Sequence, residues 1–178
     1  YDAGFEFWGS LALRSGPDNY YLLSWEKHLN NYRDFIPYSR KHNYQGIVLT
    51  SWSTSGIYGF EWDAFYEPIA MHPIRRVYPL KGFNILLAAF NKALSHDEIF
   101  DPKSFVIDYV KKHFGLSDKN ATHFYNSLMA NPSPVYVPKT ELSKPVKEVL
   151  PGVKKANLLL KKIKPTKNKV DFEHFRLM

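Results

Sequence analysis

Side chains that could hold a sugar are concentrated in one short segment of the chain. Trp52 opens this segment, Tyr58 follows it, and Glu67 closes it. A flat indole packs well against the C–H face of a pyranose ring, and a nearby carboxylate can accept hydrogen bonds from the sugar hydroxyl groups. Trp52, Tyr58 and Glu67 are therefore candidates for contact with a carbohydrate. The other interpretation is that a chain with 16% aromatic residues simply has a bulky core.

Other kinds of chemistry lack the residues that they need. The sequence contains no cysteine, which excludes disulfides, thiolate metal sites and cysteine nucleophiles. Its 7 histidines are scattered, without the His-Glu-x-x-His motif or any other close ligand spacing. The sequence has no phosphate-binding loop, dinucleotide fingerprint or nucleophile elbow. We expect neither a metal nor an organic cofactor.

The elements around Trp52 follow the order strand, helix, strand. Residues 5–8 predict a short strand, and the almost continuous apolar run 46–50 predicts a parallel strand that is buried on both faces. Between them, apolar residues recur every three or four positions over 20–42, which predicts a helix that Pro37 kinks or divides. The segment 51–59 would then be a loop at the carboxyl end of a strand, where β/α-barrel proteins place their binding residues.

The rest of the chain is predicted to be helical. Helical periodicity recurs in five further segments, which are 62–78, 81–94, 105–114, 119–129 and 140–164. Pro145 and Pro151 favour two helices over one in the last of these segments. We predict an α/β fold in two parts: the C-terminal portion of a (β/α)8 TIM barrel over residues 1–94 and an all-α region over residues 95–178.

Two segments of the first part resemble family-20 glycoside hydrolases. They are Phe7-Trp8-Gly9-Ser10-Leu11-Ala12-Leu13 and Gln45-Gly46-Ile47-Val48-Leu49-Thr50-Ser51-Trp52, joined by a helix that contains His28-Leu29-Asn30-Asn31. The nearest branch resembles the hexosaminidase D type, in which a tryptophan-glycine strand end, a long helix and a glycine-isoleucine strand ending in tryptophan form the last two barrel units. The similarity covers about residues 5–94.

This resemblance implies an exo-acting β-N-acetylhexosaminidase that removes terminal N-acetylglucosamine or N-acetylgalactosamine by substrate-assisted hydrolysis. In that mechanism the 2-acetamido carbonyl of the substrate attacks the anomeric carbon, a glutamic acid protonates the leaving oxygen, and an aspartate orients the acetamide. The acid pair of the family follows the fourth barrel strand, which would precede Tyr1, so no catalytic residue is expected in this chain. Trp52 would form the floor under the sugar, and Trp8 would hold the equivalent place on the preceding strand.

Two positions depart from the family pattern. Ser53 and Thr54 follow the strand-end tryptophan, where much of the family has a glutamate that holds sugar hydroxyls. Gly9 stands where related branches have a tyrosine that binds the acetamide carbonyl. That role would pass to Tyr58 or to a residue outside this chain.

The dipeptide Asp97-Glu98 could be mistaken for the catalytic pair of such an enzyme. It follows a predicted helix, however, whereas the family pair follows a buried strand. Ser95 with Glu98 three residues later has the spacing of a capping box, in which two side chains satisfy free N–H groups at a helix start. We therefore predict that Asp97 and Glu98 belong to a helix cap.

The charge of the chain is uneven. Residues 139–178 contain 11 Lys or Arg against 4 Asp or Glu, while residues 1–138 contain 13 of each kind. Lysines along helices usually form a solvated face, and no apolar run approaches the roughly 20 residues that span a bilayer, so we expect neither nucleic acid nor membrane as a partner.

Both ends of the chain are predicted to be cuts rather than natural termini. The expected partners are therefore an amino-sugar glycan and the missing N-terminal part of the barrel. The alternative function is a non-catalytic carbohydrate-binding or interaction module that uses the same aromatic residues without an acid.

Overall fold

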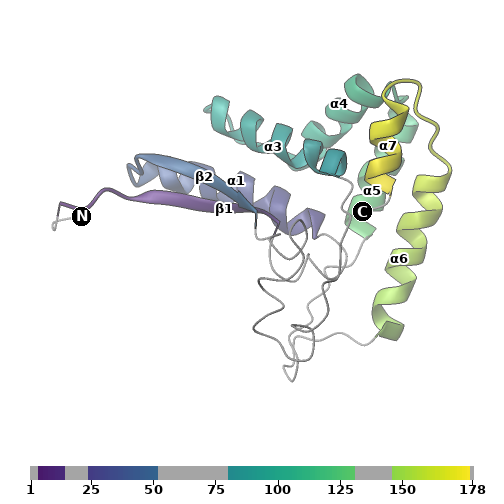
Figure 1. The fold of residues 1–178 in the computed structure, drawn as a ribbon, viewed down its shortest axis with the longest axis horizontal. Helices are drawn as coiled ribbons and strands as arrows, with labels where there is room; N and C mark the ends of the chain where they lie inside the picture. The colour runs from purple at the N-terminus through teal and green to yellow at the C-terminus, as the bar shows by residue number, and fades with distance from the viewer. Residues whose placement is uncertain (1–3, 15–23, 52–79, 131–145, 177–178) are drawn as a thin grey trace, which may run out of the picture.

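The computed structural model describes residues 4–14, 24–51, 80–130 and 146–176. In chain order the elements are β1 (Trp8–Arg14), α1 (Trp25–Lys41), β2 (Gly46–Ser51), the short 3-10 helix η4 (Leu80–Phe83), α3 (Asn84–Ser95), α4 (Pro102–Phe114), α5 (Asp118–Ala130), α6 (Val146–Lys161) and α7 (Lys169–Arg176). This part of the chain is mostly helical with one small parallel sheet, which is a mixed α/β arrangement (Figure 1). The helix predicted over 62–78 lies outside the described residues.

The sheet consists of β1 and β2, which pair in parallel and are joined through α1. The second predicted strand is confirmed, but the first is wrong in position, because β1 begins at Trp8, where the predicted strand ended. Gly9 and Leu11 are buried while Phe5 remains 75% exposed. The position of β1 therefore follows from the alternate residues that are buried against α1. Phe5 and Phe7, which helped to suggest a strand at 5–8, precede β1.

Helix α1 does not break at Pro37. The helix runs from Trp25 to Lys41, and its buried residues include Ile36 and Ser39 on either side of the proline. Pro37 itself is exposed, so the backbone carbonyl that loses its N–H partner can be solvated. Packing of the flanking residues therefore outweighs one missing hydrogen bond. The predicted division at Pro37 is wrong, while the predicted kink stays a prediction.

Asp101 caps the start of α4. Its side chain accepts hydrogen bonds from the backbone N–H groups of Lys103 (3.4 Å) and Ser104 (2.9 Å), and Pro102 occupies the first helical position. The predicted capping box at Ser95 is wrong, since Ser95 is the last residue of α3. The helices predicted over 105–114 and 119–129 are confirmed, with α4 beginning three residues earlier than predicted.

The last predicted helical segment differs from the structure at Pro151. The prediction was two helices, because the segment contains Pro145 and Pro151. Pro151 lies inside α6, which runs from Val146 to Lys161, so it divides no helix, and residues 140–145 lie outside the described residues. Like Pro37 it is exposed. The chain turns after Pro165 instead, and α7 follows as a separate short helix.

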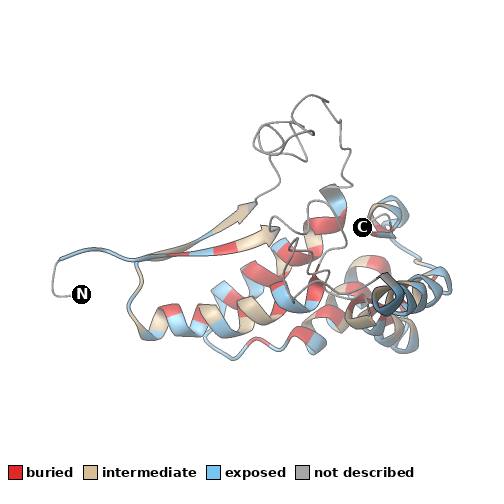
Figure 2. Cartoon of the chain, turned by 90° about the horizontal axis from the view of Figure 1, so that it is seen from below, coloured by how far each residue is buried: buried red, intermediate tan, exposed pale blue. Residues whose placement is uncertain are grey.

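One hydrophobic core joins the two predicted parts of the chain. Figure 2 shows buried residues along the helices, and the buried core includes residues on both sides of the predicted boundary at residue 94. Trp25 of α1 contacts Phe175 of α7, with 5.1 Å between ring centroids. Both belong to the cluster that also includes Leu11 of the sheet and Phe124 of α5. None of the described helices is long and apolar enough to cross a membrane.

Candidate functional site

The predicted site lies at the carboxyl end of the sheet. Because β1 and β2 are parallel, both strands finish at the same edge, β1 at Arg14 and β2 at Ser51. The register shifts between Ala12 and Arg14, which is a bulge-like irregularity of the kind that is frequent at barrel rims and beside active sites. Trp52 follows β2 directly in the sequence. The strand that was predicted to carry it is therefore present.

Three of the predicted sugar contacts lie outside the described residues: Trp52, Tyr58 and Glu67. The fourth, Trp8, is described, and its predicted position is wrong. Trp8 is the first residue of β1 and pairs with Gly46, the first residue of β2, at the amino end of the sheet. A strand of this length spans about 20 Å. Trp8 therefore lies about one strand length away from the edge where Trp52 leaves the sheet.

The surroundings of Trp8 give it a structural role. Its indole is 61% exposed, and its ring lies over Gly46 so closely that a Cβ atom on Gly46 would collide with it. Neighbouring strands can fill the space on one face of a sheet by pairing a large side chain with a glycine. The ring was predicted as a sugar-binding wall because the strand was expected to end at Trp8.

The two faces of the sheet have different surroundings. On the face toward α1, Gly9 and Leu11 are buried, and a Cβ on Gly9 would lie 2.6 Å from the Phe35 ring. On the opposite face Ser10 is exposed and Val48 is 45% exposed. A tyrosine at position 9 would point toward α1, so the tyrosine of the related branches has no equivalent at this position.

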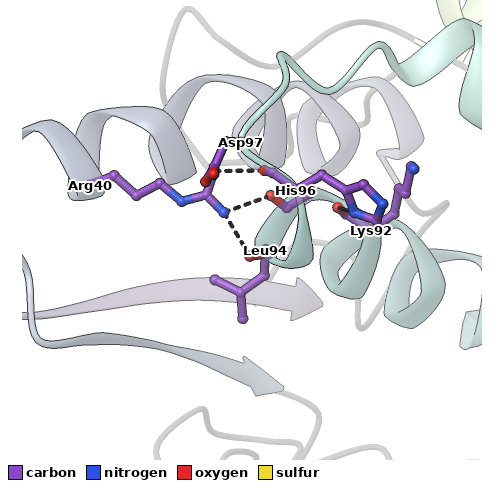
Figure 3. Close-up of polar contacts among 6 residues, drawn as sticks. Arg40, Lys92, Leu94, His96 and Asp97 are labelled. Atoms are coloured by element: carbon purple, nitrogen blue, oxygen red, sulfur yellow. Dashed lines mark hydrogen bonds and ion pairs between the residues drawn. The ribbon is translucent and has the colours of Figure 1, made fainter.

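Arg40 links α1 to the end of α3 (Figure 3). Its guanidinium donates hydrogen bonds to the carbonyl oxygens of Leu94 (2.6 Å) and His96 (2.8 Å) and a longer one to Ala93 (3.3 Å). These carbonyls belong to the last turn of α3 and its cap, where backbone acceptors lack helical partners. Asp97 lies 3.8 Å from Arg40 and its side chain is fully exposed. The dipeptide Asp97-Glu98 therefore sits in an exposed loop after a helix and does not line a site.

We expect the Arg40→Ala variant to lose about 1–2 kcal/mol of unfolding free energy, because charged donors make the stronger hydrogen bonds and these are partly exposed to solvent. Arg33→Ala is the matched control, since that guanidinium is bonded to its exposed neighbour Asp34. Urea unfolding followed by circular dichroism measures both. Equal midpoints for the two variants would show that the Arg40 contacts add nothing to stability.

A carboxylate, an imidazole, an ammonium group and a phenol meet at Asp171 on α7. Lys81 Nζ lies 3.0 Å from Asp171 Oδ1, and His113 Nε2 lies 3.5 Å from Oδ2, at the outer limit of a hydrogen bond. The hydrogen bond from Lys81 lowers the pKa of Asp171 below its usual value, with a smaller contribution from His113. Burial, together with the Asp171 charge, raises the pKa of Tyr109 to about 12. Through Asp171 these contacts join α7 to η4 and α4.

The described residues contain no cluster of three or more His, Asp or Glu side chains that could hold a metal ion. No family model, curated protein or solved structure matches the chain. The functional assignment therefore depends on the residues and the geometry of the sheet.

Sequence reasoning missed two of the polar contacts described above. The Asp101-Pro102 pair is a helix-start signal, with a capping side chain followed by proline at the first helical position, and it could have been recognised. The contacts of Arg40 join residues more than 50 positions apart, and no local pattern marks them.

Proposed function

We propose that this chain is the C-terminal part of the β/α barrel of a family-20-like β-N-acetylhexosaminidase, followed by a helical region. The intact enzyme would remove terminal N-acetylglucosamine or N-acetylgalactosamine by substrate-assisted hydrolysis. This chain would supply part of the sugar-binding rim. The aspartate and glutamate of the reaction would come from residues that precede Tyr1.

The observation that carries this proposal is the parallel strand–helix–strand unit, in which Ser10 and Val48 on the face opposite α1 are exposed. Parallel sheets are found almost only where both faces are covered, and two strands alone are a marginal sheet. The face opposite α1 carries Ser10, Val48 and Thr50, which are small or medium residues suited to the packed interior of a barrel. Further strands would pair with the outer edges of β1 and β2 and enclose this face.

In the proposed site Trp52 lies at the rim because it follows β2. Its indole would pack under the apolar face of the terminal amino sugar and keep water away from the reacting carbon. Tyr58 would donate a hydrogen bond to the acetamide carbonyl and Glu67 would accept hydrogen bonds from sugar hydroxyls. Trp8 would fill the amino end of the barrel interior and would not touch the sugar.

The assay is hydrolysis of a chromogenic N-acetylglucosaminide and its galactosaminide analogue by the intact protein. We expect Trp52→Ala to lower kcat/KM on the order of tenfold, the loss expected when one aromatic packing contact disappears. Trp8→Ala is the matched control, and we expect its kcat/KM to stay within about twofold of the unchanged protein.

Equal losses in the two variants would contradict the proposed rim. Absence of turnover by the intact protein, combined with quenching of tryptophan fluorescence by N-acetylglucosamine, would instead favour the non-catalytic binding module. The 178-residue chain alone should show no turnover.

A further inference from the structure

The outer face of α6 carries a regular array of lysines. α6 packs along α5 and lies at the outside of the helical region (Figure 1). Ala156, on its inner side, is buried. The residues that we name the lysine face are all exposed: Lys147, Lys154, Lys155 and Lys161 on the outer side of α6, and Lys162, which follows the helix.

Seven-residue spacing aligns three of these lysines along the helix. Lys147, Lys154 and Lys161 form one row, Lys155 lies beside this row, and Lys162 follows the last residue of α6. Seven residues are close to two helical turns, so successive lysines of a row lie on the same side at intervals of about 10.5 Å.

One leucine lies among these lysines. Leu158 is three or four positions away from Lys154, Lys155 and Lys161, which makes these three its neighbours on the helix surface. It is 60% exposed.

The lysine face is not neutralised by its surroundings. Among the residues that the structure describes, none of the five lysines forms an ion pair, whereas Lys81 and Lys111 elsewhere do. The only acidic residue within α6 is Glu148. Because residues 1–138 have balanced charges, the positive potential of the chain is centred on this helical region and would attract an anion.

We propose that the lysine face is a docking surface for a linear acidic glycan, one that carries sulfate or carboxylate groups at intervals of about two sugar rings. Identifying this glycan as the substrate class rests on the proposed function. The glycan would lie along α6 with its acidic groups on successive lysines and the C–H face of a sugar ring on Leu158.

The spacing and chemistry of the face favour a glycan over nucleic acid. A strand of duplex DNA carries a phosphate every ~3.4 Å, about three times as often as the lysines recur. The face contains no arginine, the residue that forms bidentate contacts with phosphate. Leu158 at its centre has an apolar partner in a pyranose ring and none in a phosphate backbone.

The arrangement also disfavours a bilayer. A helix that lies in a membrane interface buries a broad apolar side in the acyl region. The apolar side of α6 is directed at α5 instead, and Leu150 and Leu158 are the exposed large apolar residues that remain on the helix.

The test is fluorescence anisotropy of an end-labelled chondroitin sulfate hexasaccharide titrated with the intact protein. In the variant Lys154→Gln/Lys161→Gln we expect binding to weaken on the order of tenfold, and the slope of log Kd against log salt to fall by about two, as two ionic contacts are lost. The control variant Lys92→Gln/Lys103→Gln removes the same charge from exposed positions on α3 and α4 and should bind as the unchanged protein does.

Equal weakening of binding in both variants would overturn the docking surface, because it would show that binding depends on the net charge of the protein and not on the positions of these lysines. Tighter binding of a duplex DNA of equal charge, or of phosphatidylserine vesicles, would overturn the choice of a glycan. Anisotropy measures binding without requiring turnover. If the protein binds the glycan through these lysines but hydrolyses no amino sugar, the substrate assignment and the proposed function are overturned. The docking surface itself would stand. Hydrolysis without lysine-dependent binding would overturn the surface alone.

Discussion

Replacing Phe124 by alanine is expected to lower the free energy of unfolding by about 3–5 kcal/mol, the usual cost of removing a buried phenyl ring. Phe124 is fully buried in the middle of α5. Its ring centroid lies 6.0 Å from that of Phe114, 6.1 Å from that of Phe172 and 4.5 Å from that of Phe175. The variant would leave a cavity where α4, α5 and α7 meet.

Urea unfolding of the intact protein, followed by tryptophan fluorescence and by circular dichroism, measures this loss. Phe5→Ala is the matched control, since the same atoms are removed from a side chain that is 75% exposed. A midpoint for Phe124→Ala close to that of the control would contradict the aromatic core. An unchanged slope of free energy against urea would show that the change lies in stability and not in the extent of unfolding.

Long, strongly periodic segments were predicted well from the sequence. The helices α3, α4 and α5 and the strand β2 carry apolar residues at the period of their own secondary structure, and each forms near its predicted position. The strand β1 was misplaced because its inward positions include Gly9, which adds nothing to the apolar pattern. The exposed Phe5 gave a stronger local signal than the residues that are actually buried.

Helix ends and breaks were predicted less well, since each depends on a competition between nearby signals. The Ser95 spacing suggested a cap, but α3 continues through Ser95 and Asp101 caps α4. Pro37 and Pro151 suggested breaks, yet both lie inside helices and both are exposed. A carbonyl that faces water loses little when its N–H partner is missing, and the sequence does not tell which side of a helix a proline will occupy.

The candidate site was predictable only where it depends on the sheet. A parallel strand that ends just before Trp52 follows from the apolar run, and β2 has that form. Trp8 and Trp52 could be neighbours only if β1 ended at Trp8. The structure instead places Trp8 at the start of β1. In barrels, binding residues lie at the carboxyl ends of the strands, whereas residues at the amino ends contribute to stability. Moving the predicted strand by its own length therefore transfers a residue from the first group to the second.

The boundary predicted at residue 94 stays a prediction, although the described elements on its two sides share a core. Trp25 contacts Phe175, and Lys81 pairs with Asp171. Contacts of this kind join segments that are distant in the sequence. Compositional shifts mark where the chain changes from mixed to helical, but they do not show whether the two parts pack together.

Replacing Gly115 by alanine is expected to cost about 2–3 kcal/mol, for two separable reasons. Gly115 ends α4 in the left-handed conformation with φ of 66°, which costs a residue with a Cβ about 1–2 kcal/mol. A Cβ there would also collide with Thr166 Oγ1, which donates a hydrogen bond to Gly115 O at 3.0 Å. Displacing that hydroxyl would lose a bond worth about 1 kcal/mol.

Thr166 belongs to the segment that closes the end of α4. The backbone N–H groups of Thr166 and Lys167 donate to Phe114 O at 3.0 and 3.1 Å, and the Asn168 amide donates to His113 O at 2.8 Å. These bonds satisfy carbonyls at the helix end and lead the chain into α7. A disturbance at Gly115 should therefore also loosen α7.

A double-mutant cycle separates the two costs. In the Thr166→Ala background the hydroxyl is absent, so Gly115→Ala should cost only the conformational part, and the coupling between the two substitutions should be about 1 kcal/mol. Gly4→Ala is the control for conformation alone, since Gly4 also has a positive φ of 73° but has no neighbouring atom in reach of a Cβ. Strictly additive effects in the cycle would show that the Thr166 side chain can move away from a Cβ at position 115 without loss of stability. The left-handed backbone would then be the whole reason for glycine at this position.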